Sequence, residues 1–384
     1  MKVKKKSIQN LRDARAVVET IGVYNDVREI MSEKVLFLVL EIEEVSSAAA
    51  NILKQVAISR GSDAVVHRDI VTGSVEKSKV LLPGTIRELK LISEELKKQP
   101  FGLPEVGNNI LKILKNENAK PAFSVMGVLN VTPDSFSDGG DYFNEEDARK
   151  RFAEIEKEGA DIIDVGAESS RPGAKRLEIQ EELSRLKSLF PLFEKSSIPV
   201  SIDTYKSKIA EGALSKGAKI VNDISALRMD RKMVKVIRDY KSRVVLMHMQ
   251  GTPKIMQDNP HYDDVVKEIG EFFEERVNFC LSNGIDEDKI ILDPGIGFGK
   301  RQEDNLAILS NLEEFTSYGF PILIGTSRKS FIGRITGEDV KRRLDASLAT
   351  AVYSYLKGVS IFRVHDVRQT KNALSVVSAI GEMK

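Results

Sequence analysis

The sequence predicts an α/β protein in which a (β/α)₈ barrel follows a small α/β domain. Eight short apolar, strand-like segments alternate with eight helical segments between residues 123 and 380, a pattern typical of parallel sheets covered by helices. A boundary near residue 118 leaves about 266 of the 384 residues for this part, close to the roughly 250 residues of such a barrel. A doubly wound open sheet is the alternative, but the count of eight favours the barrel.

The first 118 residues predict an α/β domain whose role the composition does not indicate. Strand-like segments occur at 35–42, 64–70 and 79–82, and helical segments at 46–59, 85–98 and 106–114. The polar stretch 115–120 then interrupts the apolar periodicity before Pro121, as a linker does. We therefore expect domains at 1–118 and 119–384.

In the second domain, each predicted strand is followed by a predicted helix. The strands are expected at 123–129, 161–165, 199–202, 219–221, 244–247, 290–292, 321–324 and 360–362. The helices are expected at 145–158, 179–194, 207–216, 232–239, 263–283, 303–312, 344–357 and 370–380.

Composition excludes several classes of protein. With 41% hydrophobic residues, 58 basic and 57 acidic side chains, the chain is not disordered as a whole. Its near-zero net charge gives no reason to expect nucleic-acid or membrane-surface binding. No apolar run approaches the roughly 20 residues of a membrane span, and the basic start lacks the apolar stretch of a signal peptide. A single cysteine, Cys280, excludes an intramolecular disulfide. We expect a cytoplasmic protein.

Polar residues end the predicted strands of the barrel. Any one of them could simply begin a loop or cap a helix. Because the carboxyl ends of barrel strands meet at one mouth, where barrel enzymes carry out their chemistry, eight such ends together predict an active-site face. The strand ends are Asn130, Asp164, Asp203, Asn222, His248, Asp293, Gly325–Thr326 and Arg363–His365.

Eight motifs at these strand ends resemble, in the correct order, the signatures of the dihydropteroate synthase family. The resemblance extends from residue 121 to about 380 and does not cover residues 1–118. Three positions depart from the common pattern: Ala167 replaces a frequent glycine, and Ser170 and Val364 replace usual threonines. The motifs lie at 126–140, 164–173, 201–204, 221–224, 246–251, 293–300, 325–330 and 363–367.

The resemblance implies a diphosphate and metal site at Asn130, Arg363 and His365. A guanidinium fork and an imidazole two residues apart suit phosphate oxygens. The neutral oxygen of Asn130 suits Mg²⁺, which keeps several waters in protein sites. Mg²⁺ is the cofactor that we expect.

Further positions match the family's pterin-binding residues: Asp164, Asp203, Asn222, Asp293 and Lys329. Carboxylates can accept hydrogen bonds from the N–H groups of a pterin, while an amide and a lysine serve the other ring atoms. Asp203 and Asp293 could instead cap helices, and Asp164 could orient Asn222 or approach the metal. Lys329 could in principle form a Schiff base, although ring hydrogen bonding is simpler.

The second substrate and the catalytic loop complete the implied site. Ser170, Arg171, Pro172 and Ser327 resemble the parts that bind p-aminobenzoate, with Phe298 packing on its ring and Ser330 receiving its carboxylate at a helix start. Phe136 and Asp138 resemble residues that close over the reacting group. The implied catalytic residues are Asn130, Phe136, Asp138, Lys329, Arg363 and His365.

The resemblance implies a transferase of folate biosynthesis that acts as a homodimer. It would condense 6-hydroxymethyl-7,8-dihydropterin diphosphate with p-aminobenzoate, giving 7,8-dihydropteroate and diphosphate. Three alternatives stay open: a synthase that uses a modified aminobenzoate, a pterin-dependent methyltransferase with a corrinoid partner, and a non-catalytic pterin-binding scaffold. The Arg363 and His365 pair argues against methyl transfer, in which there is no diphosphate to hold.

Overall fold

The computed structural model describes residues 1–6, 8, 10–70, 72–116, 122–131, 145–169 and 176–382. The chain forms two compact units, whose main parts are Met1–Lys120 and Pro121–Ile380. Among the described residues, no helix combines the length and apolar character needed to cross a membrane.

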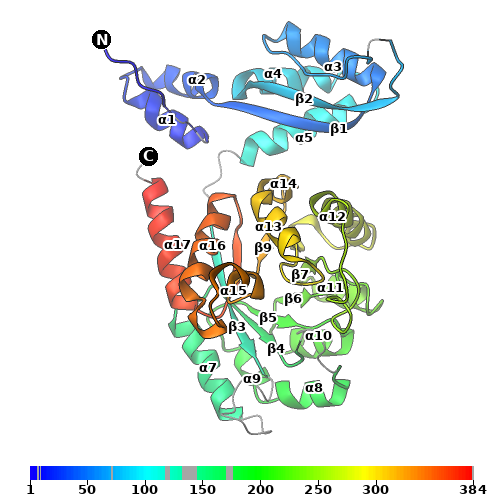
Figure 1. Cartoon of the computed structure of the whole chain (residues 1–384), viewed down its shortest axis with the longest axis vertical. Helices are drawn as coiled ribbons and strands as arrows, with labels where there is room; N and C mark the ends of the chain where they lie inside the picture. The colour runs from blue at the N-terminus through cyan, green and yellow to red at the C-terminus, as the bar shows by residue number, and fades with distance from the viewer. Residues whose placement is uncertain are drawn as a thin grey trace. The chain divides into compact units, whose positions relative to one another are not determined.

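The N-terminal unit packs helices around a two-stranded antiparallel sheet (Figure 1). Its core contains Leu53, Leu82, Leu89 and Ile92. Thr85, at the end of β2, begins α4 with a capping box to Glu88. In order, the elements are α1 (Leu11–Glu19), α2 (Asn25–Val35), β1 (Phe37–Ser46), α3 (Ser47–Ser59), β2 (Lys77–Thr85), α4 (Ile86–Leu96) and α5 (Leu103–Asn116).

The strand predicted at 64–70 is wrong. Val65 forms an isolated bridge with Leu81 of β2, and the chain then turns, with the Ile70 N–H donating to the His67 carbonyl at 3.0 Å. This turn prevents an extended ladder, so apolar residues on either side of a polar His-Arg-Asp sequence do not make a strand.

The second unit is a barrel of eight parallel strands, which confirms the predicted fold. Neighbouring strands follow the order β8-β7-β6-β5-β4-β3-β10-β9, and a parallel bridge between Leu292 and Ile322 joins the two end strands. The doubly wound alternative is therefore wrong. The strands are β3 (Ser124–Asn130), β4 (Ile162–Gly166), β5 (Val200–Asp203), β6 (Ile220–Asp223), β7 (Arg243–Met247), β8 (Ile290–Asp293), β9 (Leu323–Ile324) and β10 (Ile361–Val364).

Helices cover the outside of these strands (Figure 1). The helix predicted at 179–194 is two helices, because Pro191 has no N–H to donate within a continuing helix. The described helices are α7 (Glu145–Lys157), α8 (Ile179–Leu186), α9 (Phe190–Phe193), α10 (Ser207–Leu214), α11 (Met233–Tyr240), α12 (Val265–Ser282), α13 (Gln302–Ser310), α14 (Leu312–Thr316), α15 (Ser330–Thr336), α16 (Leu344–Leu356) and α17 (Val367–Glu382).

A layer of buried apolar side chains fills the barrel interior and forms the floor of its mouth. Seven strands contribute one residue each: Met126, Ile162, Ile220, Val245, Ile291, Leu323 and Ile361. Because side chains alternate along a strand, the residue two positions later points to the same interior. Those positions include Asp164, Asn222, Asp293 and Arg363, which explains why the polar strand ends meet.

Gly127 lets the helices approach the outer face of β3. A Cβ at this position would lie 2.5 Å from Ile155 Cγ2 and 2.9 Å from Val367 Cγ2. We expect Gly127→Ala to lower the free energy of unfolding by about 1–3 kcal/mol, as overpacking does. Denaturant unfolding measures this change, and Gly212→Ala in α10 is the matched control.

At Gly212 the added Cβ would meet its nearest neighbour at 3.6 Å, and alanine favours a helix over glycine by about 1 kcal/mol. Gly212→Ala is thus expected to be neutral or stabilising. Equal effects of the two substitutions would contradict the packing argument.

Candidate active site

A pocket opens at the mouth of the barrel, above the apolar floor. Its empty volume is about 490 Å³, counting the open mouth, which lies within the range of small-molecule sites. Eight residues expected from the sequence line it: Asp203, Asn222, Asp293, Phe298, Ser327, Lys329, Arg363 and His365. Val128, Ile224, Met247 and Ile296 supply apolar walls.

Arg363 joins two carboxylates on neighbouring strands. Its Nε donates to Asp164 Oδ2 and its Nη2 to Asp203 Oδ2, both at 2.7 Å. Asp164 is completely buried, and these two carboxylates raise the pKa of the guanidinium despite its burial. The residue expected to bind diphosphate thus also neutralises two of the expected pterin-binding carboxylates.

Asp164 lies behind the pocket lining and orients Asn222. Asn222 Nδ2 donates to Asp164 Oδ2 at 3.0 Å, which matches the first of the two roles considered for this aspartate. The other carboxylate oxygen of Asp164, Oδ1, is buried and has no hydrogen-bond partner among the described residues.

Asp203 is half-buried and Asp293 is buried, and neither caps a helix. The helices that follow β5 and β8 are α10 and α13, and their N-cap residues are Lys206 and Arg301. Asp293 instead accepts from the Gly295 N–H at 2.7 Å within its own loop. Burial raises the pKa of Asp203, against the Arg363 charge. Burial also raises the pKa of Asp293 to about 6.

Lys329 enters the pocket from the loop after β9. Its Nζ donates to the Ile296 carbonyl at 2.9 Å and lies 4.2 Å from the centre of the Phe298 ring. Burial lowers the pKa of Lys329 to about 8, although Asp293 favours its charged form. Phe298, expected to pack on the benzoate ring, thus packs on this ammonium group.

Ser327 contacts His365 at the pocket rim. Its Oγ accepts from the His365 N–H at 3.2 Å and lies 3.1 Å from His365 Nδ1. Desolvation by the surrounding chain, together with the Arg363 and Arg328 cations, lowers the pKa of His365 to about 4. The imidazole is therefore neutral near pH 7. Ser330 is exposed as the first residue of α15 and does not line the pocket.

Of the remaining expected residues, only Asn130 lies in the described part of the chain. Asn130 ends β3 and is half-buried, outside the pocket lining. Phe136, Asp138, Ser170, Arg171 and Pro172 lie outside the described residues.

Sequence reasoning missed a buried lysine beneath the pocket loop. Lys300 Nζ lies 3.0 Å from His248 Nδ1 and donates to the carbonyls of Phe298 and His248. Burial lowers the pKa of Lys300 to about 7 and that of His248 to about 2. This contact connects the end of β7 to the loop after β8. The available signal in the sequence was that Lys300 directly follows the glycine-rich turn at 295–299, where a lysine can reach the backbone carbonyls of the turn.

A second missed group surrounds Lys206. It includes Glu182, whose position in α8 between Ile179 and Leu186 places a carboxylate on the apolar face of the helix. A charge on such a face was the signal for a buried ion pair.

Comparison with known proteins agrees with this geometry. Residues 126–365 match the family described as pterin binding enzyme, so the barrel and its polar mouth belong to that class. The dihydropteroate synthase of Escherichia coli K12 is 43% identical over 256 residues, which are 66% of this chain and 90% of the relative.

Solved structures show the same likeness. The Xanthomonas albilineans dihydropteroate synthase with 4-aminobenzoic acid is 40% identical, with a TM-score of 0.64 over 68% of this chain and 93% of that one. The same organism's enzyme in complex with 7,8-dihydropteroate is 37% identical, with a TM-score of 0.61 over 68% and 95%. The chain belongs to the dihydropteroate synthase family and is a transferase.

Proposed function

We propose that the chain condenses 6-hydroxymethyl-7,8-dihydropterin diphosphate with p-aminobenzoate, releasing diphosphate and forming 7,8-dihydropteroate for folate biosynthesis. The observation that carries the proposal is the meeting of Asp203, Asn222, Asp293, Lys329 and Arg363 at one barrel mouth. These residues offer acceptors to the pterin N–H groups and cations to its oxygens and phosphates.

The reaction is a substitution at the pterin CH₂ group. The C–O bond to diphosphate breaks and its electron pair leaves with the diphosphate, while the amine nitrogen forms the new C–N bond and loses a proton. Asp293 and Asn222 hold the ring, and Lys329 stabilises charge on it. Because no side chain needs to act as a nucleophile, the protein contributes positioning and electrostatic stabilisation.

Arg363 and His365 lie at the carboxyl end of β10 and line the pocket, where they could bind the diphosphate leaving group. A fully charged diphosphate can compete with Asp164 and Asp203 for the guanidinium fork. His365, neutral before binding, can accept a proton as the anion arrives. Arg363 thereby connects pterin binding to diphosphate binding.

Mg²⁺ fits the oxygen donors that lie near this end of the barrel. Asn130 on β3 offers an amide oxygen, and the unpartnered Oδ1 of Asp164 on the adjacent β4 offers a carboxylate oxygen. Two oxygens with several waters and substrate phosphates are typical of Mg²⁺ sites. When bound, the ion would neutralise charge on the departing diphosphate.

The second substrate is assigned through the relatives. The Xanthomonas albilineans structure with 4-aminobenzoic acid supports p-aminobenzoate as the acceptor. We assign its binding to Ser170, Arg171, Pro172, Ser327 and Ser330, with Phe298 beside the ring. We also propose that the protein is cytoplasmic and acts as a homodimer.

The test is turnover by the purified full-length protein with Mg²⁺ and the pterin diphosphate. Equal release of diphosphate and dihydropteroate on addition of p-aminobenzoate is expected. No product would refute the assignment, product only with a modified aminobenzoate would change the acceptor, and pterin binding without turnover would indicate a scaffold. Methyl transfer from a methylated pterin to a corrinoid protein would indicate the methyltransferase.

Pterin affinity is expected to be greatest between about pH 6 and pH 8. Asp293, whose pKa is raised to about 6, loses acceptor capacity as the pH falls below that value. Lys329, whose pKa is lowered to about 8, loses its charge as the pH rises above it. Calorimetry with a phosphate-free 6-hydroxymethyl pterin measures this dependence without phosphate ionisation.

Asp293→Asn is expected to weaken binding and remove the acid limb of this profile, and Lys329→Met to remove the alkaline limb. Constant affinity of the unmodified protein from pH 5 to pH 9 would contradict the assignment of these two groups to the pterin.

A further inference from the structure

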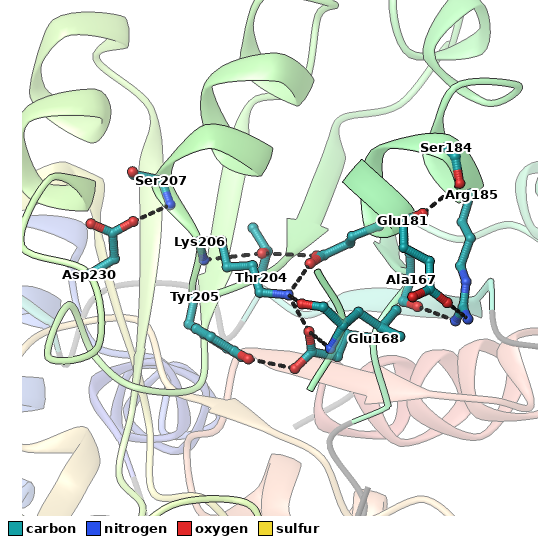
Figure 2. Close-up of polar contacts among 12 residues, drawn as sticks. Ala167, Glu168, Glu181, Ser184, Arg185, Thr204, Tyr205, Lys206, Ser207 and Asp230 are labelled. Carbon is teal, nitrogen blue, oxygen red and sulfur yellow. Dashed lines mark hydrogen bonds and ion pairs between the residues drawn. The ribbon is translucent and has the colours of Figure 1, made fainter. Parts of the chain in front are cut away.

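Two lysines are buried in the described part of the barrel. Lys206 forms ion pairs with Glu168 and Glu182 (Figure 2), and neither glutamate lines the pocket. Lys300 instead donates to the carbonyl of Phe298, a residue that does line the pocket. Lys300 is therefore the buried lysine that is connected to the pocket.

Lys300 has one acceptor for each N–H group of its ammonium. Its Nζ lies 3.0 Å from His248 Nδ1 and donates to the carbonyls of His248 at 3.3 Å and Phe298 at 3.1 Å. The imidazole is a neutral acceptor near pH 7, because burial and nearby cations lower the pKa of His248 to about 2. Only 2% of Lys300 is exposed. Since a buried charge is costly unless its hydrogen bonds are made, these three contacts fix the position of Nζ.

The loop after β8 is held through four consecutive carbonyl groups. The carbonyls of residues 296 to 299 accept, in order, from Lys329 at 2.9 Å, Gln257 at 2.9 Å, Lys300 at 3.1 Å and the Tyr262 hydroxyl at 2.7 Å. Gln257 and Tyr262 both belong to the segment that follows β7. Because every donor is a side chain, these contacts decide the path of the loop backbone.

The loop also packs directly on the end of β7. Gly295 has a φ of +69°, and a Cβ at this position would lie 2.0 Å from the His248 carbonyl oxygen. The His248 N–H donates to the Asp293 carbonyl at 2.9 Å. Lys300 thus joins one end of the loop to the same strand end on which the other end of the loop packs. The residues between them have little freedom to move.

The loop in turn holds the ammonium group of Lys329. This group donates to the Ile296 carbonyl and lies 4.2 Å from the centre of the Phe298 ring. All three residues line the pocket. A displacement of the loop therefore displaces the ammonium group that the proposed function assigns to the pterin.

We propose that Lys300 and Tyr262 are positioning residues for the pterin site, which hold residues 296–298 against the end of β7 so that the Lys329 ammonium keeps one position. The inference rests on the proposed function, in which Lys329 contacts the ring. Neither Lys300 nor Tyr262 lines the pocket, so their effect on pterin binding passes through the loop.

The first experiment is hydrogen–deuterium exchange of the full-length protein without ligand. The amides of Gly297 and Phe298 both donate to acceptors within the structure. Lys300→Met should raise their exchange rates by about 10-fold or more, the usual effect of losing a hydrogen bond to a charged group. Lys254→Met, at an exposed lysine of the segment after β7, is the matched control and should leave the rates unchanged. Equal rates in the two variants would overturn the proposal.

A second variant covers the case in which Lys300→Met does not fold. Tyr262→Phe removes only the hydroxyl that donates to the Gly299 carbonyl and keeps the ring, whose centre lies 5.9 Å from that of His248. It is expected to raise the exchange rates of the same two amides by about threefold, as the loss of one neutral hydrogen bond does. Unchanged rates in Tyr262→Phe would also overturn the proposal.

Pterin binding tests whether the effect passes through Lys329. Calorimetry with the phosphate-free pterin should give a Kd about 10-fold higher in Lys300→Met than in Lys254→Met, the order expected when a positioning group is displaced. In a Lys329→Met background, adding Lys300→Met should raise Kd by less than about twofold, because residues that act through one another are not additive. A general loss of stability would have equal effects in both backgrounds, and that result would overturn the positioning role.

These measurements separate the inference from the proposed function, because neither exchange nor pterin binding requires turnover. Absence of dihydropteroate from the unmodified protein would overturn the function alone. Equal exchange rates in Lys300→Met and Lys254→Met would overturn the inference even if the unmodified protein forms dihydropteroate.

Discussion

Substitution of Arg363 by methionine is expected to lower the free energy of unfolding of the barrel by about 3–5 kcal/mol, the usual effect of removing one partner of a buried ion pair. The reason is that Asp164 and Asp203 would both lose their guanidinium partner, and Asp164 has no exposed surface. Chemical denaturation measures the change. The same variant should lower kcat/KM by at least about 100-fold, because the diphosphate would also lose its cation.

Two further variants test this explanation. Arg328→Met removes an arginine whose ion pair with Asp366 is more exposed to solvent, and its effect on stability should be clearly smaller. Arg363→Lys should recover only part of the loss, because a single ammonium cannot reproduce the planar fork that reaches both aspartates. A stability loss below about 1 kcal/mol in Arg363→Met, the value of an ordinary surface ion pair, would contradict the bridging role.

Substitution of Lys329 by methionine is expected to lower kcat/KM by about 100- to 1,000-fold, the effect of removing one preorganised charge-stabilising group. Lys329 and Asp293 both line the pocket, and the Lys329 ammonium group donates to the Ile296 carbonyl. Methionine keeps most of the side-chain volume and removes the charge. Steady-state kinetics with the pterin diphosphate as the varied substrate measures the loss.

The matched control is Lys341→Met, at an exposed lysine, which should leave kcat/KM unchanged. Calorimetry with the phosphate-free pterin separates binding from chemistry: weaker binding alone indicates ring recognition, and a lower kcat indicates stabilisation of the reacting group. A loss in kcat/KM of less than about fivefold would remove Lys329 from the proposed mechanism.

Most of the barrel could be predicted because its strands are short apolar runs that alternate regularly with longer amphipathic helical segments. The strands around Met126 and Ile291 are short continuous apolar runs, buried on both faces as parallel strands are, and such runs are visible without a structure. The strand predicted at 64–70 shows the limit. Its apolar residues resembled those of a strand, but the backbone turns between His67 and Ile70, where a hydrogen bond joins the two residues.

The site could be predicted as a set of residues but not as a set of contacts. Asp203, Asn222 and Asp293 lie at the ends of β5, β6 and β8, and Lys329 lies in the loop after β9. Because the ends of all barrel strands meet at one mouth, topology placed these residues together. The partners of Arg363 could not be read in the same way, because Asp164 and Asp203 are 199 and 160 positions away in the chain. Which oxygen a guanidinium contacts depends on register and side-chain rotamer, which no local pattern encodes.

The sequence by itself determined the succession of strands and helices along the barrel and the polar residues at the strand ends, because apolar runs and the residues that end them are local properties. Only the tertiary structure decided the charge pairing: Arg363 with two aspartates, Lys300 with His248, and Lys206 with two glutamates. Burial makes each of these cations dependent on specific oxygen or nitrogen partners, and those partners come from distant strands that only the closed barrel brings within hydrogen-bond distance.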